Sequence, residues 1–169
     1  MKTKTLLIAA FLGIYAFSFS QQSPNFEKWN SLIGTWIGDG NGKPGQGVGS
    51  FTFSLDLDKN ILIRKSHTLI FATKDKKEAV HDDLMIIYGD SSGFPARAIY
   101  FDNEQHVINY NIDYSNGNII LTSEKKTGVP QFRLTYSFLD KETLHAKFDI
   151  SPTGDSFFTY IEGNSKRKQ

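Results

Sequence analysis

The sequence contains no cysteine, so disulfides, thiolate metal sites and a cysteine nucleophile are all excluded. It also contains no P-loop and no His-Glu-X-X-His zinc motif, and we predict no catalytic residue. His81, Asp82 and Asp83 are adjacent, but neighbours on a strand point to opposite faces, so they do not predict a metal site. Without disulfides, the folded chain must be stabilised by an apolar core.

Long apolar runs are absent too, with one exception near the start of the chain. Residues 6–17 are almost entirely apolar, Lys2 and Lys4 precede them, and the small residues Ser18 and Ser20 follow. This is the pattern of a secretory signal peptide, and the run is too short for a spanning helix with stop-transfer flanks. We therefore predict a signal peptide over residues 1–20, export to the periplasm or out of the cell, and no integral membrane association.

Neither sign of charge is in excess. The formal net charge is +1, and it becomes −1 without residues 1–20, because that segment carries two Lys and no acid. A near-neutral protein has no electrostatic footprint for nucleic acid and little attraction to an anionic membrane surface. We expect neither as a partner.

Aromatic residues are plentiful, with fourteen Phe and seven Tyr, and they favour strands. Residues 24–33 form the one short helical pattern, with Phe26, Trp29 and Ile33 on one face, and Gly34 ends it. Gly34-Thr35-Trp36 then opens the first strand. We expect the helix to lie across one end of the fold and Trp36 to close that end.

From residue 51 the hydrophobic period is two, and turn residues recur at short intervals. The strongest turn signal is Asn116-Gly117, which is typical of a tight hairpin. No connection is long enough for a crossover helix, so the strands are antiparallel. We predict an all-β domain over residues 25–168: a single up-and-down antiparallel barrel of about ten strands with a short N-terminal helix, in preference to a sandwich, because closure removes the edge strands. The expected strands after the first are residues 51–57, 61–73, 81–88, 96–101, 107–114, 119–125, 131–139, 143–150 and 157–163.

Residues 38–49 form a glycine-rich segment that we expect to be a loop. Residues 40–45 match a dinucleotide-binding fingerprint in form, but a strand follows them and not the helix that would hold the phosphates. The segment also begins like a calcium loop, but its twelfth position is Ser50 and not Glu.

Gly34-Thr35-Trp36 after a short helix resembles the Gly-X-Trp opening of lipocalins and their calycin relatives. In those proteins a basic residue from the last strand covers the Trp, and the resemblance gives Arg167 this role. A broader likeness, over about residues 30–168, is to a family of small bacterial lipocalin-like barrels of largely unknown function. The residues that carry it are Gly34-Thr35-Trp36, Tyr100-Phe101-Asp102, Arg133-Leu134-Thr135-Tyr136, Ile150-Ser151-Pro152-Thr153-Gly154-Asp155-Ser156-Phe157, Glu162 and Arg167.

Nitrobindin-type haem barrels share the Gly-Thr-Trp opening and a following glycine-rich loop. This sequence departs from them, because no Tyr-Pro-Thr segment follows the loop and residues 157–163 contain no His as axial ligand. A haem-binding barrel is thus an alternative that these departures disfavour, and no cofactor is predicted.

If the more apolar row of each strand faces inward, the lumen is aromatic and aliphatic with a few polar groups. A site with that lining suits a small hydrophobic molecule, which is the partner we predict. Three alternatives stay open: a filled barrel that serves as an interaction module, a barrel enzyme with a His and a carboxylate in reach of each other, and the haem protein. The polar residues predicted to line the ligand site are His67, Tyr88, His106, Tyr110 and Tyr136.

Overall fold

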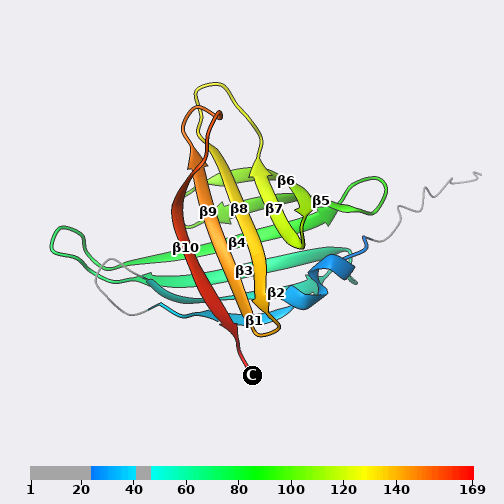
Figure 1. The fold of residues 1–169 in the computed structure, drawn as a ribbon, viewed down its shortest axis with the longest axis horizontal. Helices are drawn as coiled ribbons and strands as arrows, with labels where there is room; N and C mark the ends of the chain where they lie inside the picture. Colours follow the sequence, from blue (N-terminus) through cyan, green and yellow to red (C-terminus); the bar gives the residue numbers. More distant parts are fainter. Residues whose placement is uncertain (1–23, 41–46) are drawn as a thin grey trace, which may run out of the picture.

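The alternating segments form a closed barrel of ten antiparallel strands in a computed structural model that describes residues 24–40 and 47–169 (Figure 1). The signal-peptide prediction for residues 1–20 lies outside the described residues. The elements are η1 (Glu27–Leu32), β1 (Gly34–Gly38), β2 (Gly47–Asp56), β3 (Ile61–Ile70), β4 (Ala79–Gly89), β5 (Pro95–Asp102), β6 (Val107–Ser115), β7 (Asn118–Ser123), β8 (Gln131–Asp140), β9 (Thr143–Ser151) and β10 (Phe158–Arg167).

Each strand pairs with the next one along the chain, and β1 pairs with β10 to close the ring. The predicted up-and-down barrel is confirmed. Asn116 and Gly117 both have positive φ, +51° and +77°, which is the backbone of the tight turn that their sequence predicts. Figure 1 shows β1 to β5 running across the view and β8 to β10 crossing them steeply, so two crossed walls enclose the interior.

The glycine-rich segment contributes more strand than expected, because β2 begins at Gly47. A Cβ on Gly49 would lie 2.5 Å from the backbone oxygen of His67, so the close approach of β2 to β3 requires glycine here. The last strand is also longer than predicted. It continues past residue 163 to Arg167, because residues 165–167 pair with β1.

The short helix closes one end of the barrel. It is a 3₁₀ helix, whose period of three places Phe26, Trp29 and Leu32 on the buried face, so Leu32 and not Ile33 completes the stripe. The Trp29 indole N–H donates to the hydroxyl of Tyr114 at 2.7 Å, and that hydroxyl donates to the carbonyl of Pro95 at 2.6 Å. The helix is thereby tied to β5 and β6.

Trp36 is fully buried beside this helix and packs edge-on against Phe138. The Arg167 guanidinium lies over the Trp36 ring, 4.3 Å from its centroid. It also donates hydrogen bonds to the carbonyls of Ile33 (2.9 Å) and Ser31 (2.5 Å). Arg167 therefore joins the last strand to the helix and to the first strand.

The inward rows of β3 and β4 are the opposite of those predicted. Leu62, Met85 and Ile87 are fully buried in the core, so the even residues of β3 and the odd residues of β4 face inward. The rows predicted to face inward, Ile61 and Ile63 on β3 with Leu84 and Ile86 on β4, pair side by side on the outer surface. The prediction placed the more apolar row of each strand on the inside. It is wrong for β3 and β4 because their outer rows are the more apolar ones. Among the described residues, no helix is long and apolar enough to span a bilayer.

Candidate functional site

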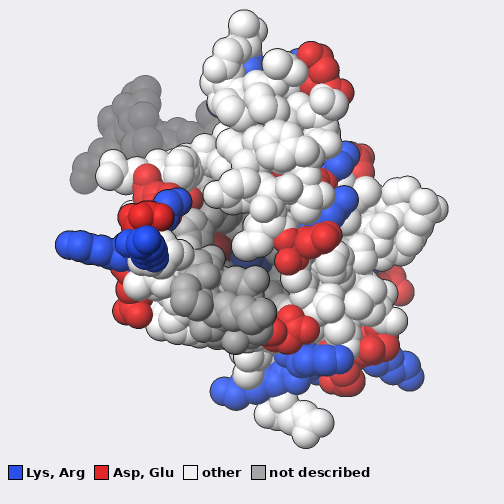
Figure 2. All heavy atoms as spheres, turned by 60° about the vertical axis from the view of Figure 1, so that its left-hand side comes forward, with Lys and Arg blue, Asp and Glu red and all other residues white. Residues whose placement is uncertain are grey.

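The end of the barrel opposite the helix is open to solvent. Phe158 and Ile161 lie in the inward register of β10, opposite Ile150 and Phe148, yet they are 51% and 63% exposed. Figure 2 turns this end forward and shows the surface hollowed near its middle. Solvent therefore reaches inward-facing apolar side chains here.

One wall of this open end is apolar. Phe132 and Phe148, on β8 and β9, stack with their ring centroids 5.8 Å apart and their planes at 13°. Tyr160 of β10 meets Phe148 edge-on at 6.4 Å. Leu134 and Ile150 continue the same inward rows. An apolar ligand would meet mostly aromatic and aliphatic side chains on this side.

The facing wall, formed by β3 to β5, carries buried charge. Arg64 Nη1 donates to Asp83 Oδ1 at 2.5 Å, and the two side chains are only 13% and 6% exposed. The guanidinium also lies over the ring of Phe51, 5.1 Å from its centroid. Burial alone would lower the pKa of Arg64, but the negative charges that Tyr136 and Asp83 can carry outweigh it, and its pKa is raised. Arg64 is thus a permanently charged group inside the barrel.

Two donors in this region have no hydrogen-bond partner within the described part of the chain: Arg64 Nε and the Tyr136 hydroxyl. Tyr136 is buried among Phe51 and Phe53, with ring centroids 6.5 and 5.6 Å away. Burial raises the pKa of Tyr136 to about 12, so its hydroxyl is a neutral donor.

A hydrogen-bonded chain leads from this wall to the surface. The Tyr100 hydroxyl donates to Asp102 Oδ2 at 3.2 Å and lies 3.0 Å from His81 Nε2. His106 Nδ1 lies 2.8 Å from Asp102 Oδ2, and His81 Nδ1 lies 3.3 Å from Glu104 Oε1. Burial and the charge of Asp83 raise the pKa of Tyr100 far above its ordinary value, so Tyr100 acts as a donor and not as a base.

The structure places the five predicted lining residues in three settings. Tyr110 and Tyr136 face inward and are buried. His106 is 59% exposed and pairs with Asp102, which is 3% exposed. His67 and Tyr88 lie in the outward rows, and His67 is 63% exposed and paired with Asp82. The prediction that these two residues line the lumen is therefore wrong, because of the reversed rows.

Sequence reasoning missed the polar wall. Arg64 and Asp83 fell in the outward rows because the more apolar row of each strand was taken as the inward one, and Asp102 was expected in the turn after residues 96–101. Tyr100-Phe101-Asp102 did carry a signal, since a Tyr and an Asp two residues apart share one face of a strand. Arg64, which lies between Ile63 and Lys65 in the chain, carried no comparable signal.

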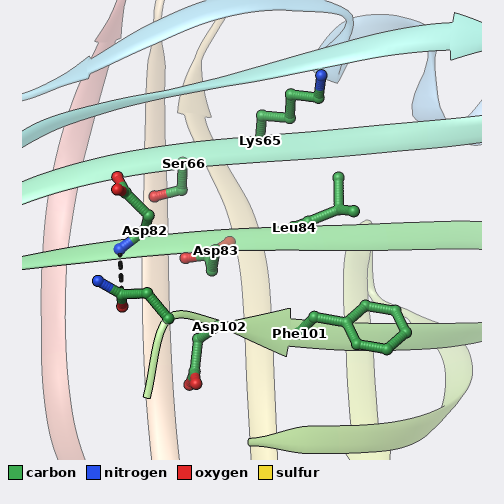
Figure 3. A pocket seen from close by; sticks show the side chains of 8 residues that line it. Lys65, Ser66, Asp82, Asp83, Leu84, Phe101 and Asp102 are labelled. Atoms are coloured by element: carbon green, nitrogen blue, oxygen red, sulfur yellow. Dashed lines mark hydrogen bonds between the residues drawn. The ribbon is translucent and has the colours of Figure 1, made fainter. Parts of the chain in front are cut away.

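A second hollow, of about 400 Å³, lies against β3, β4 and β5 and is shallow and open. Figure 3 shows the side chains around it, with the hydrogen bond from the Asp82 N–H to Asn103 Oδ1 (3.2 Å). It borders the apolar outer rows through Leu84 and Phe101. No described group of three or more His, Asp or Glu side chains is arranged to hold a metal ion.

The turn between β4 and β5 has the Gly-X-Ser-X-Gly spacing of a hydrolase nucleophile elbow, at Gly89-Asp90-Ser91-Ser92-Gly93. An elbow needs a helix after the turn, but β5 follows here. Asp90 Oδ1 instead accepts hydrogen bonds from the backbone N–H groups of Ser92 (2.8 Å) and Phe94 (3.2 Å). The Gly-X-Ser-X-Gly spacing here therefore belongs to a turn capped by Asp90, and it assigns no nucleophile.

No protein-family model matches the chain, and no curated protein matches it. Solved structures that are similar in fold include the following two. Rv2717c from M. tuberculosis has a TM-score of 0.57 at 14% identity, over 85% of this chain and 97% of that one. The S-type phycobiliprotein lyase CPES from Guillardia theta has a TM-score of 0.51 at 8% identity, over 85% and 92%. At such identities the likeness concerns the fold alone, and together with the closed ten-stranded ring it identifies a lipocalin-like barrel.

Proposed function

We propose that the protein binds a small, mainly apolar molecule in the barrel lumen, and that the ligand enters at the end opposite the helix. The observation that carries this proposal is that Phe158 and Ile161 face inward and are still more than half exposed. Burying apolar surface is worth about 25 cal/mol per Å², so a ligand that covers these side chains gains affinity from them.

The two walls give the ligand an orientation. An apolar body would lie along Phe132 and Phe148, and a polar end would point toward Arg64 and Tyr136. A pocket with mostly apolar lining and a few polar groups is the usual form of a small-molecule site. One of the similar structures is named a phycobiliprotein lyase, and at 8% identity it supports a shared barrel and not a shared ligand.

Nile red, a neutral dye whose emission rises in apolar surroundings, tests the proposal. Ile161→Asp puts a charge on the inward row and should weaken dye binding at least fivefold. Val107→Asp is the matched control, because Val107 is 60% exposed and lies on the outward row of β6. Absence of dye binding by the unaltered protein, or equal loss in both variants, would contradict a lumenal site.

Native mass spectrometry of protein from its own host, followed by extraction, would identify the natural ligand. We also propose that the protein is exported, on the basis of the signal-peptide pattern in residues 1–20. Processing is tested by sequencing the N-terminus of the protein from that host.

A second candidate function is catalysis on a lipophilic substrate, favoured by one observation. His106 Nδ1 lies 2.8 Å from Asp102 Oδ2, and Asp102 also accepts a hydrogen bond from the hydroxyl of Tyr100. A His and a carboxylate are therefore within hydrogen-bond reach of each other at the rim of the lumen. Turnover of a lipophilic ester or ketone that is lost in His106→Gln but kept in His67→Gln would favour this candidate. Equal rates in both variants would remove it.

A further inference from the structure

The two unpartnered donors described above are unusual for a folded protein. Arg64 Nε and the Tyr136 hydroxyl are both buried, and neither finds an acceptor within residues 24–40 and 47–169. Buried polar groups are nearly always hydrogen-bonded, and an unsatisfied one weakens the fold. Two such donors in one region indicate an acceptor that residues 24–40 and 47–169 do not supply.

Both donors belong to side chains that lie near Phe51. The ring of Phe51 lies 5.1 Å from the guanidinium of Arg64 and 6.5 Å from the ring of Tyr136. The charge of Arg64 also acts on both Tyr136 and Tyr110. Arg64 comes from β3 and Tyr136 from β8, so the donors approach the interior from two different walls.

The charges already present decide what kind of acceptor fits. Asp83 neutralises Arg64 at 2.5 Å, and its side chain is only 6% exposed. Asp102, at 3% exposure, adds a second carboxylate to the same wall. A carboxylate ligand would therefore enter a region whose cation is already paired and would have to be desolvated without a counter-charge.

We infer that the ligand carries an uncharged hydrogen-bond acceptor, a carbonyl oxygen of the ketone, ester or amide kind, which accepts from Arg64 Nε and the Tyr136 hydroxyl. Its apolar remainder lies along Phe132 and Phe148 toward the open end. This inference rests on the proposed lumenal binding site and adds the chemistry of the ligand's polar group. No covalent bond is made or broken in the binding step.

A matched set of ten-carbon compounds tests the inference through displacement of Nile red. We expect 2-decanone to displace the dye at a concentration about three- to tenfold lower than decane, which corresponds to about one hydrogen bond. Decanoate should be the weaker competitor at pH 7. Equal displacement by decane and 2-decanone, or tighter binding of decanoate, would overturn the inference and leave the proposed apolar site standing. If the dye does not bind at all, the proposed function fails as well.

Tyr136→Phe removes only the hydroxyl and gives a signature that a structural role alone would not produce. The unliganded variant should be at least as thermostable as the parent, because an unsatisfied polar group is gone. At the same time it should lose the preference for 2-decanone over decane. Arg64→Lys removes Nε–H, keeps a cation for Asp83 and should lower the same preference.

Tyr88→Phe is the matched control, because Tyr88 lies on the outward row of β4. It should keep the parent preference. A preference for 2-decanone that survives unchanged in Tyr136→Phe would overturn the inference.

Discussion

Arg64 and Asp83 form an ion pair inside the barrel, with Nη1 and Oδ1 2.5 Å apart. Because both side chains are almost fully buried, the loss of one partner would leave an uncompensated charge in the interior. We expect Asp83→Ala to lower the free energy of unfolding by about 3–5 kcal/mol. Urea denaturation at neutral pH measures this.

The double variant Arg64→Met, Asp83→Leu removes both charges and should cost much less than Asp83→Ala alone, since apolar pairs often replace buried ion pairs without loss. If Asp83→Ala lowers the free energy of unfolding by less than about 1 kcal/mol, the effect is that of an exposed ion pair, and water must reach the two groups.

Arg167 should matter to stability through its guanidinium and not through its charge in general. It covers Trp36 and donates to the carbonyls of Ser31 and Ile33. We expect Arg167→Met to cost about 1–3 kcal/mol and to change the tryptophan emission. Lys168→Met removes a neighbouring exposed charge and should change neither. If both variants melt alike, the closure of the barrel does not depend on this contact.

The strands of this fold could be predicted from the sequence, but the side of each strand that faces inward could be predicted only in part. Alternation divides a strand into two rows without saying which one is inside. On β6 and β8 the inner rows are the more apolar ones, so Tyr110 and Tyr136 were assigned correctly to the interior. On β3 and β4 the outer rows hold Ile and Leu, while the inner rows hold Arg64 and Asp83.

The polar wall could not be predicted for a physical reason. A charged residue faces inward only when a partner from another strand neutralises it, and such a pairing depends on the register between strands. The sequence alone does not fix that register. The closing contact between Trp36 and Arg167 was expected only through the resemblance to lipocalins, because the two residues are far apart in the chain.

Acid should destabilise the protein partly through Asp102. Burial alone would raise the pKa of Asp102, but the backbone N–H groups of His106 and Glu104 and the His106 side chain outweigh it, and its pKa is lowered. A lowered folded-state pKa contributes stability that is present above the unfolded value, near pH 4, and is lost as the pH falls through the folded value.

Asp102→Asn should therefore be less stable than the parent at pH 7 and lose less stability between pH 4 and pH 2. Asp58→Asn, in the exposed turn after β2, is the control and should follow the parent curve. Parallel curves for the parent and Asp102→Asn below pH 4 would mean that Asp102 has an ordinary pKa.

Two glycines should respond to the same substitution in opposite directions. A Cβ at Gly49 would lie 2.5 Å from the carbonyl oxygen of His67 and 2.7 Å from Thr68 Oγ1, so β2 and β3 would have to separate. We expect Gly49→Ala to cost about 1–3 kcal/mol. A Cβ at Gly163 would meet no described atom within 4 Å, and Gly163 has no positive φ. Gly163→Ala should thus raise stability by about 0.4–1 kcal/mol by restricting the unfolded chain. Thermal unfolding of both variants measures the difference, and a tolerated alanine at Gly49 would mean that β2 and β3 are further apart at this end of the barrel.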